Sequence, residues 1–182
     1  MTKNYMLSIV LSRRDIREFD QIVAFYSLEY GRVDVLARGL KKILSKNSAY
    51  LLPGNIVEAE IIVGKENFTL GAVEPVESWS DLWKNFSSQL FLQWSLNFAT
   101  VLLHKQEPDA QIFKLFYRWL KFLNETGTPS VALADHFVKR LLACLGFDPE
   151  QDKKINDHKS LYNFAVYHTE KHLGDWGTLS VP

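Results

Sequence analysis

The sequence has little cysteine, no net charge and no long apolar run, and each shortage excludes a class of protein. The single cysteine, Cys144, allows no internal disulfide and no multi-cysteine zinc cluster. Lysine and arginine together number 21, as do aspartate and glutamate, so no global field attracts a polyanion. No apolar stretch approaches the ~20 residues of a membrane-spanning helix, and the first residues lack a signal-peptide pattern. We therefore expect a cytosolic protein.

The charge is unevenly spread along the chain. Up to Asn55 there are nine basic and five acidic residues, which leaves this stretch at +4. Strand alternation predicts Arg32 and Arg38 on one face, and Gly39 permits a turn into a cationic loop at 41–46. Such a local patch is how small barrels hold a polynucleotide backbone. An ordinary solvated surface is the alternative, and it is supported by Glu58 and Glu60, which are expected to face outward and repel phosphates.

The apolar periodicity predicts two kinds of structure in succession. From residue 5 to 76 apolar residues recur with period two in five short runs, which favours a small closed barrel. Phe25, Tyr26, Tyr30 and Tyr50 lie near the basic stretch and are candidates to stack bases, although most are expected in the core. After Ser78 the period becomes helical, with helices expected over 82–103, 109–126, 128–145 and 157–173. The prediction is an α+β chain with a five-stranded barrel over 1–78 and an all-α domain over 79–182.

Motifs for catalysis or metal binding are missing. There is no phosphate-binding glycine loop, no nucleophile elbow and no acidic triplet with nuclease spacing, so we expect a protein that is not an enzyme. His168 and His172 have a spacing at which two imidazoles can share a metal, but packing on the face of the last helix is the favoured interpretation. Cys144 is expected to be an inert core residue. We expect neither a metal nor a cofactor.

The predicted helical domain carries a second group of basic residues. Lys114, Arg118 and Lys121 form a stripe that we expect beside the aromatic face of the second helix, with Lys139 and Arg140 placed likewise on the third. Their functional interpretation is a pocket for an acidic, hydrophobic peptide, in which cations hold carboxylates. The alternative is that they serve solubility.

Several segments together resemble RecO proteins. Residues 8–20 (SIVLSRRDIREFD) are similar to the opening of that family, and 25–32 (FYSLEYGR) to its Phe-Thr-x-Glu-x-Gly-Lys turn. Residues 37–45 resemble its Ala-Arg-Gly-x-x-Lys-x-Ser loop, and 141–149 (LLACLGFDP) its Leu-Leu-x-x-Leu-Gly-Phe-x-Pro run. One departure is clear: the cysteine-bearing insertion that follows this run in many relatives is absent, so the chain resembles a short form without zinc.

The resemblance implies an OB-fold barrel followed by a helical domain that docks partners. It implies a nucleoid-associated mediator that binds single- and double-stranded DNA and anneals complementary strands. The implied partners are RecR, with which it helps to load RecA, and the acidic C-terminal tail of single-stranded-DNA-binding protein. The alternative is a protein-only adaptor whose degenerate barrel bridges repair partners without binding DNA.

Two sets of residues follow from the sequence and this resemblance. The family's Arg-Phe step in the third helix reads His136-Phe137 here, and Lys139 and Arg140 are candidates to replace that arginine. The residues expected to bind DNA are Arg13, Arg14, Arg32, Arg38, Lys41, Lys42 and Lys46. The residues expected to bind partner proteins are Lys114, Arg118, Lys121, His136, Lys139 and Arg140.

Overall fold

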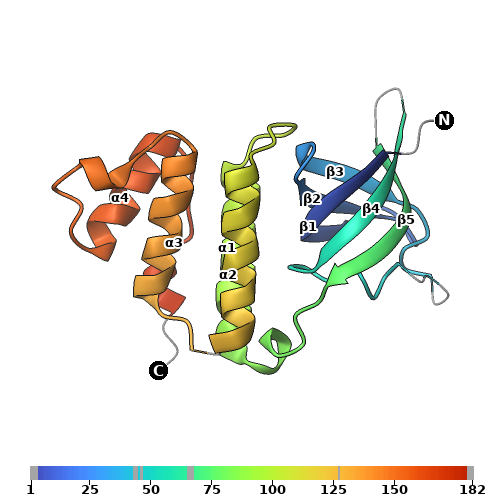
Figure 1. The fold of residues 1–182 in the computed structure, drawn as a ribbon, viewed down its shortest axis with the longest axis horizontal. Helices are drawn as coiled ribbons and strands as arrows, with labels where there is room; N and C mark the ends of the chain where they lie inside the picture. Colours follow the sequence, from blue (N-terminus) through green and yellow to red (C-terminus); the bar gives the residue numbers. More distant parts are fainter. Residues whose placement is uncertain (1–3, 43–44, 46, 65–67, 127, 180–182) are drawn as a thin grey trace. The chain divides into compact units, whose positions relative to one another are not determined.

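The computed structural model describes residues 4–42, 45, 47–64, 68–126 and 128–179, and it forms two compact units (Figure 1). The first unit contains the chain up to Ser78 together with Leu103–Phe113. The second contains Trp79–Leu102 and the chain from Lys114 onward. The connection between the first two long helices therefore belongs to the barrel unit.

The first unit is a closed barrel of five strands. Hydrogen-bonded neighbours follow the order β1-β2-β3-β5-β4, and β4 pairs with β1 to close the barrel. This is the five-stranded OB-fold architecture, so the predicted α+β fold is confirmed. The strands are β1 (Asn4–Asp15), β2 (Gln21–Ser27), β3 (Gly31–Ala37), β4 (Ile56–Val63) and β5 (Phe68–Glu77).

Alternation along the strands fills the barrel interior. In β3 the side chains of Val33 and Val35 are buried, whereas Arg32 and Asp34, which alternate with them, are only partly buried. Phe25 and Tyr26 are also fully buried. They are therefore core residues and not platforms for stacking bases. Tyr30 packs partly against this core, and Tyr50 is more exposed.

Glu60 is not exposed as expected, although Ala59 and Ile61 on either side of it keep the alternation of β4 by packing in the barrel core. Its side chain is buried, and the backbone N–H of Ala72 donates a hydrogen bond of 3.1 Å to its carboxylate. A β4–β5 register shift lies at this position, between Ala59 and Ile61. A Cβ atom on Gly71 would lie 2.6 Å from the same carboxylate, so glycine provides its space. Only Glu58 of the pair remains exposed to repel phosphates.

The second unit is helical, and four α-helices appear where the sequence predicts them. The third begins later than expected, because Ser130 and not Thr128 caps it: the Ser130 side chain accepts from the N–H of Leu133. Of the residues described, no helix combines the length and apolar character needed to cross a bilayer. The helices are α1 (Phe86–Leu102), α2 (Ala110–Thr126), α3 (Val131–Cys144) and α4 (His158–Thr169), with 3-10 turns η1 (Leu82–Lys84), η2 (Pro149–Gln151) and η3 (Trp176–Leu179).

The last helix ends earlier than the periodicity predicts. Glu170 adopts a left-handed conformation with φ of 52° and stops the helix at Thr169. His172 consequently lies outside the helix and is exposed, so it does not share a helix face with His168. Leu161 and Ala165 of the predicted face are buried, and the exposed His168 contacts the ring of Phe147. Within the described ranges, no three His, Cys, Asp or Glu side chains are grouped to hold a metal ion. Cys144 is only partly buried.

Candidate nucleic-acid interface

The turn after β3 is fastened to the β1–β2 hairpin, which brings two basic stretches together. The N–H of Gly39 donates to the carboxylate of Asp20 at 2.8 Å, and the N–H of Lys41 donates to the carbonyl of Phe19 at 3.1 Å. Gly39 has φ of +64°, a conformation that side chains rarely adopt. The turn at 38–42 is therefore held beside the hairpin that carries the arginines of β1.

Three of the predicted DNA-binding cations are exposed at this end of the barrel. Arg14, Arg38 and Lys42 are exposed, and their side chains form no hydrogen bond or ion pair with another described residue. Arg38 follows the end of β3 at Ala37, so strand alternation does not fix its direction as predicted. Lys46 lies outside the described residues.

Two other predicted cations are held by protein groups. Arg13 is partly buried and donates to Gln21 at 2.9 Å and to the carbonyl of Ser48 at 3.1 Å, and burial lowers its pKa. Lys41 Nζ lies 2.7 Å from the carboxylate of Asp15. The hydrogen bond from Gln21, followed by that from Lys41, lowers the pKa of Asp15. Asp15 therefore stays ionised and offsets part of the local positive charge.

A second basic region forms where the α1–α2 connection lies along β3. The N–H of Gln106 donates to the carbonyl of Arg32 at 3.0 Å, and Arg32 Nη1 donates to the carbonyl of Leu103 at 3.3 Å. The hydroxyl of Tyr26 accepts from the N–H of Asp109 at 3.1 Å and lies 3.3 Å from its carbonyl. These bonds fix residues 103–109 on the barrel.

Gly31 explains why this connection can approach the strand so closely. It has φ of +64°, and a Cβ atom there would lie 2.3 Å from the carbonyl oxygen of Glu107. No side chain fits at that distance, so glycine is required by both the backbone conformation and the contact. The Tyr30-Gly31-Arg32 turn is thus the place where the connection docks.

The connection and the barrel enclose a pocket of about 260 Å³. Lys105 Nζ lies 2.7 Å from the carboxylate of Asp34 across it. Lys105 was missed by the sequence reasoning, because it lies in a stretch without periodicity some 70 residues from β3. Its contact with β3 is visible only in the fold. The pocket is lined by Arg14, Ile22, Arg32, Val33, Asp34, Phe68, Lys105 and Gln106.

The basic stripe of α2 points away from the aromatic core. Phe116 and Trp119 are buried. Lys114, Arg118 and Lys121, at i, i+4 and i+7, are exposed and lie on the opposite side of the helix. The expected position beside the aromatic face is therefore wrong. Lys121 also lies 3.8 Å from Glu125.

The predicted residues of α3 are also at the surface. His136 and Arg140 are exposed, and Lys139 is partly buried. Their side chains form no hydrogen bond or ion pair with another residue that the structure describes. They are accessible to a partner, and none of them lines the pocket beside β3.

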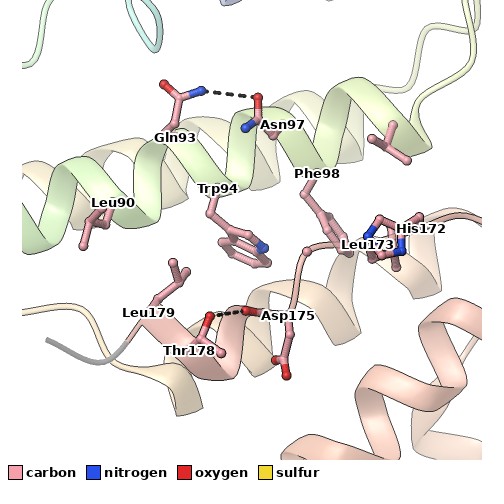
Figure 2. Close-up of a pocket in the computed structure, with 12 residues that line it drawn as sticks. Leu90, Gln93, Trp94, Asn97, Phe98, His172, Leu173, Asp175, Thr178 and Leu179 are labelled. Carbon is pink, nitrogen blue, oxygen red and sulfur yellow. Dashed lines mark hydrogen bonds between the residues drawn. The ribbon is translucent and has the colours of Figure 1, made fainter.

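A groove of about 440 Å³ lies between α1 and the segment 172–179 (Figure 2). Its apolar walls include Trp94, Phe98 and Leu173. None of the six basic residues predicted to bind partners lines it. Its acidic residue is Asp175, which disfavours an acidic peptide in this groove.

His158 links the segment 172–179 to the helices. Its Nδ1 lies 2.8 Å from Asp135 of α3, and its Nε2 lies 2.8 Å from Asp175. Two carboxylate acceptors require a proton on each ring nitrogen, so the bridge contains the charged imidazolium. Burial opposes this charge, but the bonds to Asp135 and Asp175 outweigh it and raise the pKa of His158. Trp176 Nε1 also donates to Asp135.

Comparison with known proteins extends over both units. Residues 5–79 match the family model described as "Recombination protein O N terminal", and residues 85–175 match "Recombination protein O C terminal". The DNA repair protein RecO of Clostridium novyi is 24% identical over 146 residues, which cover 80% of this chain and 57% of that protein.

Two further relatives show the same partial coverage. The DNA repair protein RecO of Listeria monocytogenes is 26% identical over 145 residues, covering 80% of this chain and 56% of that protein. That of Pelotomaculum thermopropionicum is 28% identical over 142 residues, covering 78% and 55%. The chain thus spans little more than half the length of the relatives it matches.

Proposed function

Since the chain belongs to the RecO family, we propose that it is a nucleoid-associated DNA repair mediator whose barrel binds DNA backbone without sequence preference. The observation that carries this proposal is the exposure of Arg14, Arg38 and Lys42 on the fastened hairpin and turn of the OB-fold barrel. Cations on a rigid barrel surface suit a polymer whose regular feature is its phosphate charge.

The proposed mechanism is annealing by charge neutralisation, with no bond made or broken. Phosphate contacts hold a strand in place and leave its base edges free to pair. Screening two backbones on one protein lowers the repulsion that opposes duplex formation. The same contacts serve single and double strands, because both present phosphates.

Fluorescence anisotropy with a labelled oligonucleotide tests the proposal. Neutralising ~3 to 5 phosphates predicts a slope of log Kobs against log salt of about −2 to −4. The double variant Arg38→Glu and Lys42→Glu should lose binding and annealing while its circular dichroism spectrum is retained.

The matched control is Lys153→Glu and Lys154→Glu, which reverses two exposed charges in the helical unit. Binding unaffected by the barrel variant, or affected equally by the control, contradicts the proposal. Wild-type binding without salt dependence contradicts it as well.

For the helical unit we propose the partner contacts of the family. The exposed Lys114, Arg118 and Arg140 are available to carboxylates of the single-stranded-DNA-binding protein tail, and RecR is the partner with which RecA loading is assisted. A tail-peptide pull-down with charge-reversed Lys114 and Arg118 checks this contact. If that variant still captures the tail peptide, the peptide does not bind at Lys114 and Arg118.

A protein-only adaptor is the second candidate. It is favoured by the ion pairs Lys41–Asp15 and Lys105–Asp34, which occupy basic side chains of the barrel. An adaptor captures the tail peptide but shifts no oligonucleotide in the same sample. DNA binding by the wild type excludes it.

A further inference from the structure

We propose that the pocket between β3 and the 103–109 connection is a phosphate site for a nucleic-acid strand. Asp34 pairs with Lys105 when no strand is bound, and a phosphate takes the place of Asp34 when a strand binds. The inference rests on the proposed function and assigns it a second group of residues. It extends the binding surface from the hairpin and turn to a segment that lies between two helices in the sequence.

The charges of the pocket suit a phosphodiester. Arg14 from β1, Arg32 from β3 and Lys105 from the connection all line it, against the single carboxylate of Asp34. Three positive groups and one negative group leave the pocket at +2. Side chains from three separate stretches of sequence converge there, so the charge is produced by the fold and is absent from any local motif.

The wall of the pocket also suits the uncharged part of a nucleotide. Phe68, Ile22 and Val33 line it beside the cations. The adjoining rings of Phe68 and Tyr30 have centroids 6.5 Å apart. A sugar or base placed against Phe68 would leave its phosphate toward the cations, which is the combination that single-strand binders use.

The backbone around the pocket is already in place. The bonds between Gln106 and Arg32 and between Tyr26 and Asp109 hold the connection, and Leu103 accepts from the Arg32 guanidinium. Residues 103–109 and Arg32 are therefore already held in place, and binding of a ligand does not have to order the connection.

Asp34 gives the site its distinctive behaviour. Its side chain is 23% exposed and that of Lys105 is 62% exposed, so the ion pair is accessible to solvent. Exposed ion pairs are weak, and a phosphate that also contacts two arginines is a better partner for Lys105. Asp34 is thus an internal competitor for the ammonium group.

Substitutions on the two sides of this ion pair should have opposite effects on DNA affinity. One phosphate contact on a single strand contributes about fivefold at ~0.1 M salt. We expect Lys105→Ala and Arg14→Ala each to weaken binding of a labelled oligo-dT about fivefold and to reduce the salt slope by ~0.7. Asp34→Asn should tighten binding a few-fold, and Lys105→Arg should retain it.

Lys159→Ala, an exposed change on α4, is the control and should leave affinity unchanged. If the ion pair only anchors the connection, Asp34→Asn and Lys105→Ala both weaken binding, and the pocket is overturned. It is also overturned if the wild type binds but Lys105→Ala does not change the affinity, whatever the effect of Arg14→Ala, because Arg14 also belongs to the hairpin surface. A wild type that does not bind removes the proposed function as well.

Discussion

Replacing His158 with phenylalanine should destabilise the helical unit in a pH-dependent way. The phenyl ring keeps the edge contact with Trp176, whose centroid lies 5.1 Å from that of His158, but both hydrogen bonds to carboxylates are lost. Asp135 is largely buried, so its charged bond contributes about 1.5–3 kcal/mol. Asp175 is about half exposed, and its bond contributes only ~0.2–1 kcal/mol. The expected loss is about 2–4 kcal/mol.

The sign of the pH dependence follows from the raised pKa of His158. Its contribution is fully present below the unfolded pKa of ~6.5 and is lost as pH rises through the folded pKa. Asp175 has a lowered pKa, so it contributes above ~3.9 and this contribution is lost as pH falls through its folded pKa. The bridge is therefore strongest between ~4 and ~6.5, and the deficit of the variant should shrink toward pH ~9.

Urea denaturation followed by tryptophan fluorescence measures this effect. All five tryptophans lie in the helical unit, so the signal reports that unit. His136→Gln, a substitution at an exposed position of α3, is the matched control and should change stability by less than ~0.5 kcal/mol. A deficit that is equal at pH ~6 and ~9, or an NMR titration of His158 at or below ~6.5, refutes the reasoning.

Three further substitutions test the close contacts. Gly31→Ala forces a left-handed alanine against Glu107, so the barrel should lose at least ~1–3 kcal/mol in urea denaturation followed by circular dichroism, and an unchanged midpoint contradicts the docking. Tyr26→Phe removes the hydroxyl that contacts Asp109 and should cost about 1–3 kcal/mol, with faster amide exchange at 103–109; unchanged exchange there argues against anchoring. Gly177→Ala places a Cβ 2.5 Å from the His158 ring and should lower the His158 pKa by NMR, whereas an unaltered titration means that the segment yields without breaking the bridge.

The sequence predicted the barrel because its apolar residues recur with period two over short runs. Val33 and Val35 in β3 show this pattern plainly. The exposure of Glu60 was wrongly predicted because its burial depends on the partner strand β5, where Gly71 leaves space for its carboxylate and Ala72 donates to it. The last helix was predicted too long because the apolar Leu173 extends the helical period, although Leu173 is buried and belongs to the irregular segment that follows the helix.

The candidate site was less predictable, because ion pairing depends on distant residues. Position in the sequence identified Arg14, Arg38 and Lys42, which are exposed. It gave no sign that Lys41 pairs with Asp15. It also gave no sign that residues 103–109 join the barrel, since their docking depends on space left by Gly31. A count of basic residues in the N-terminal stretch therefore overstates the charge available to DNA, because Lys41 is paired with Asp15. It also understates that charge, because residues 103–109 join the barrel.

The salt dependence of DNA binding separates these contributions. If only Arg14, Arg38 and Lys42 contact phosphates, the expected slope on single strands is about −2. If Arg32 and Lys105 also engage, the slope approaches about −3.5. Asp34→Asn should then leave the slope near the steeper value while raising affinity, because it removes a competitor without adding a contact. A wild-type slope near −2 that Lys105→Ala does not change confines binding to the hairpin and turn.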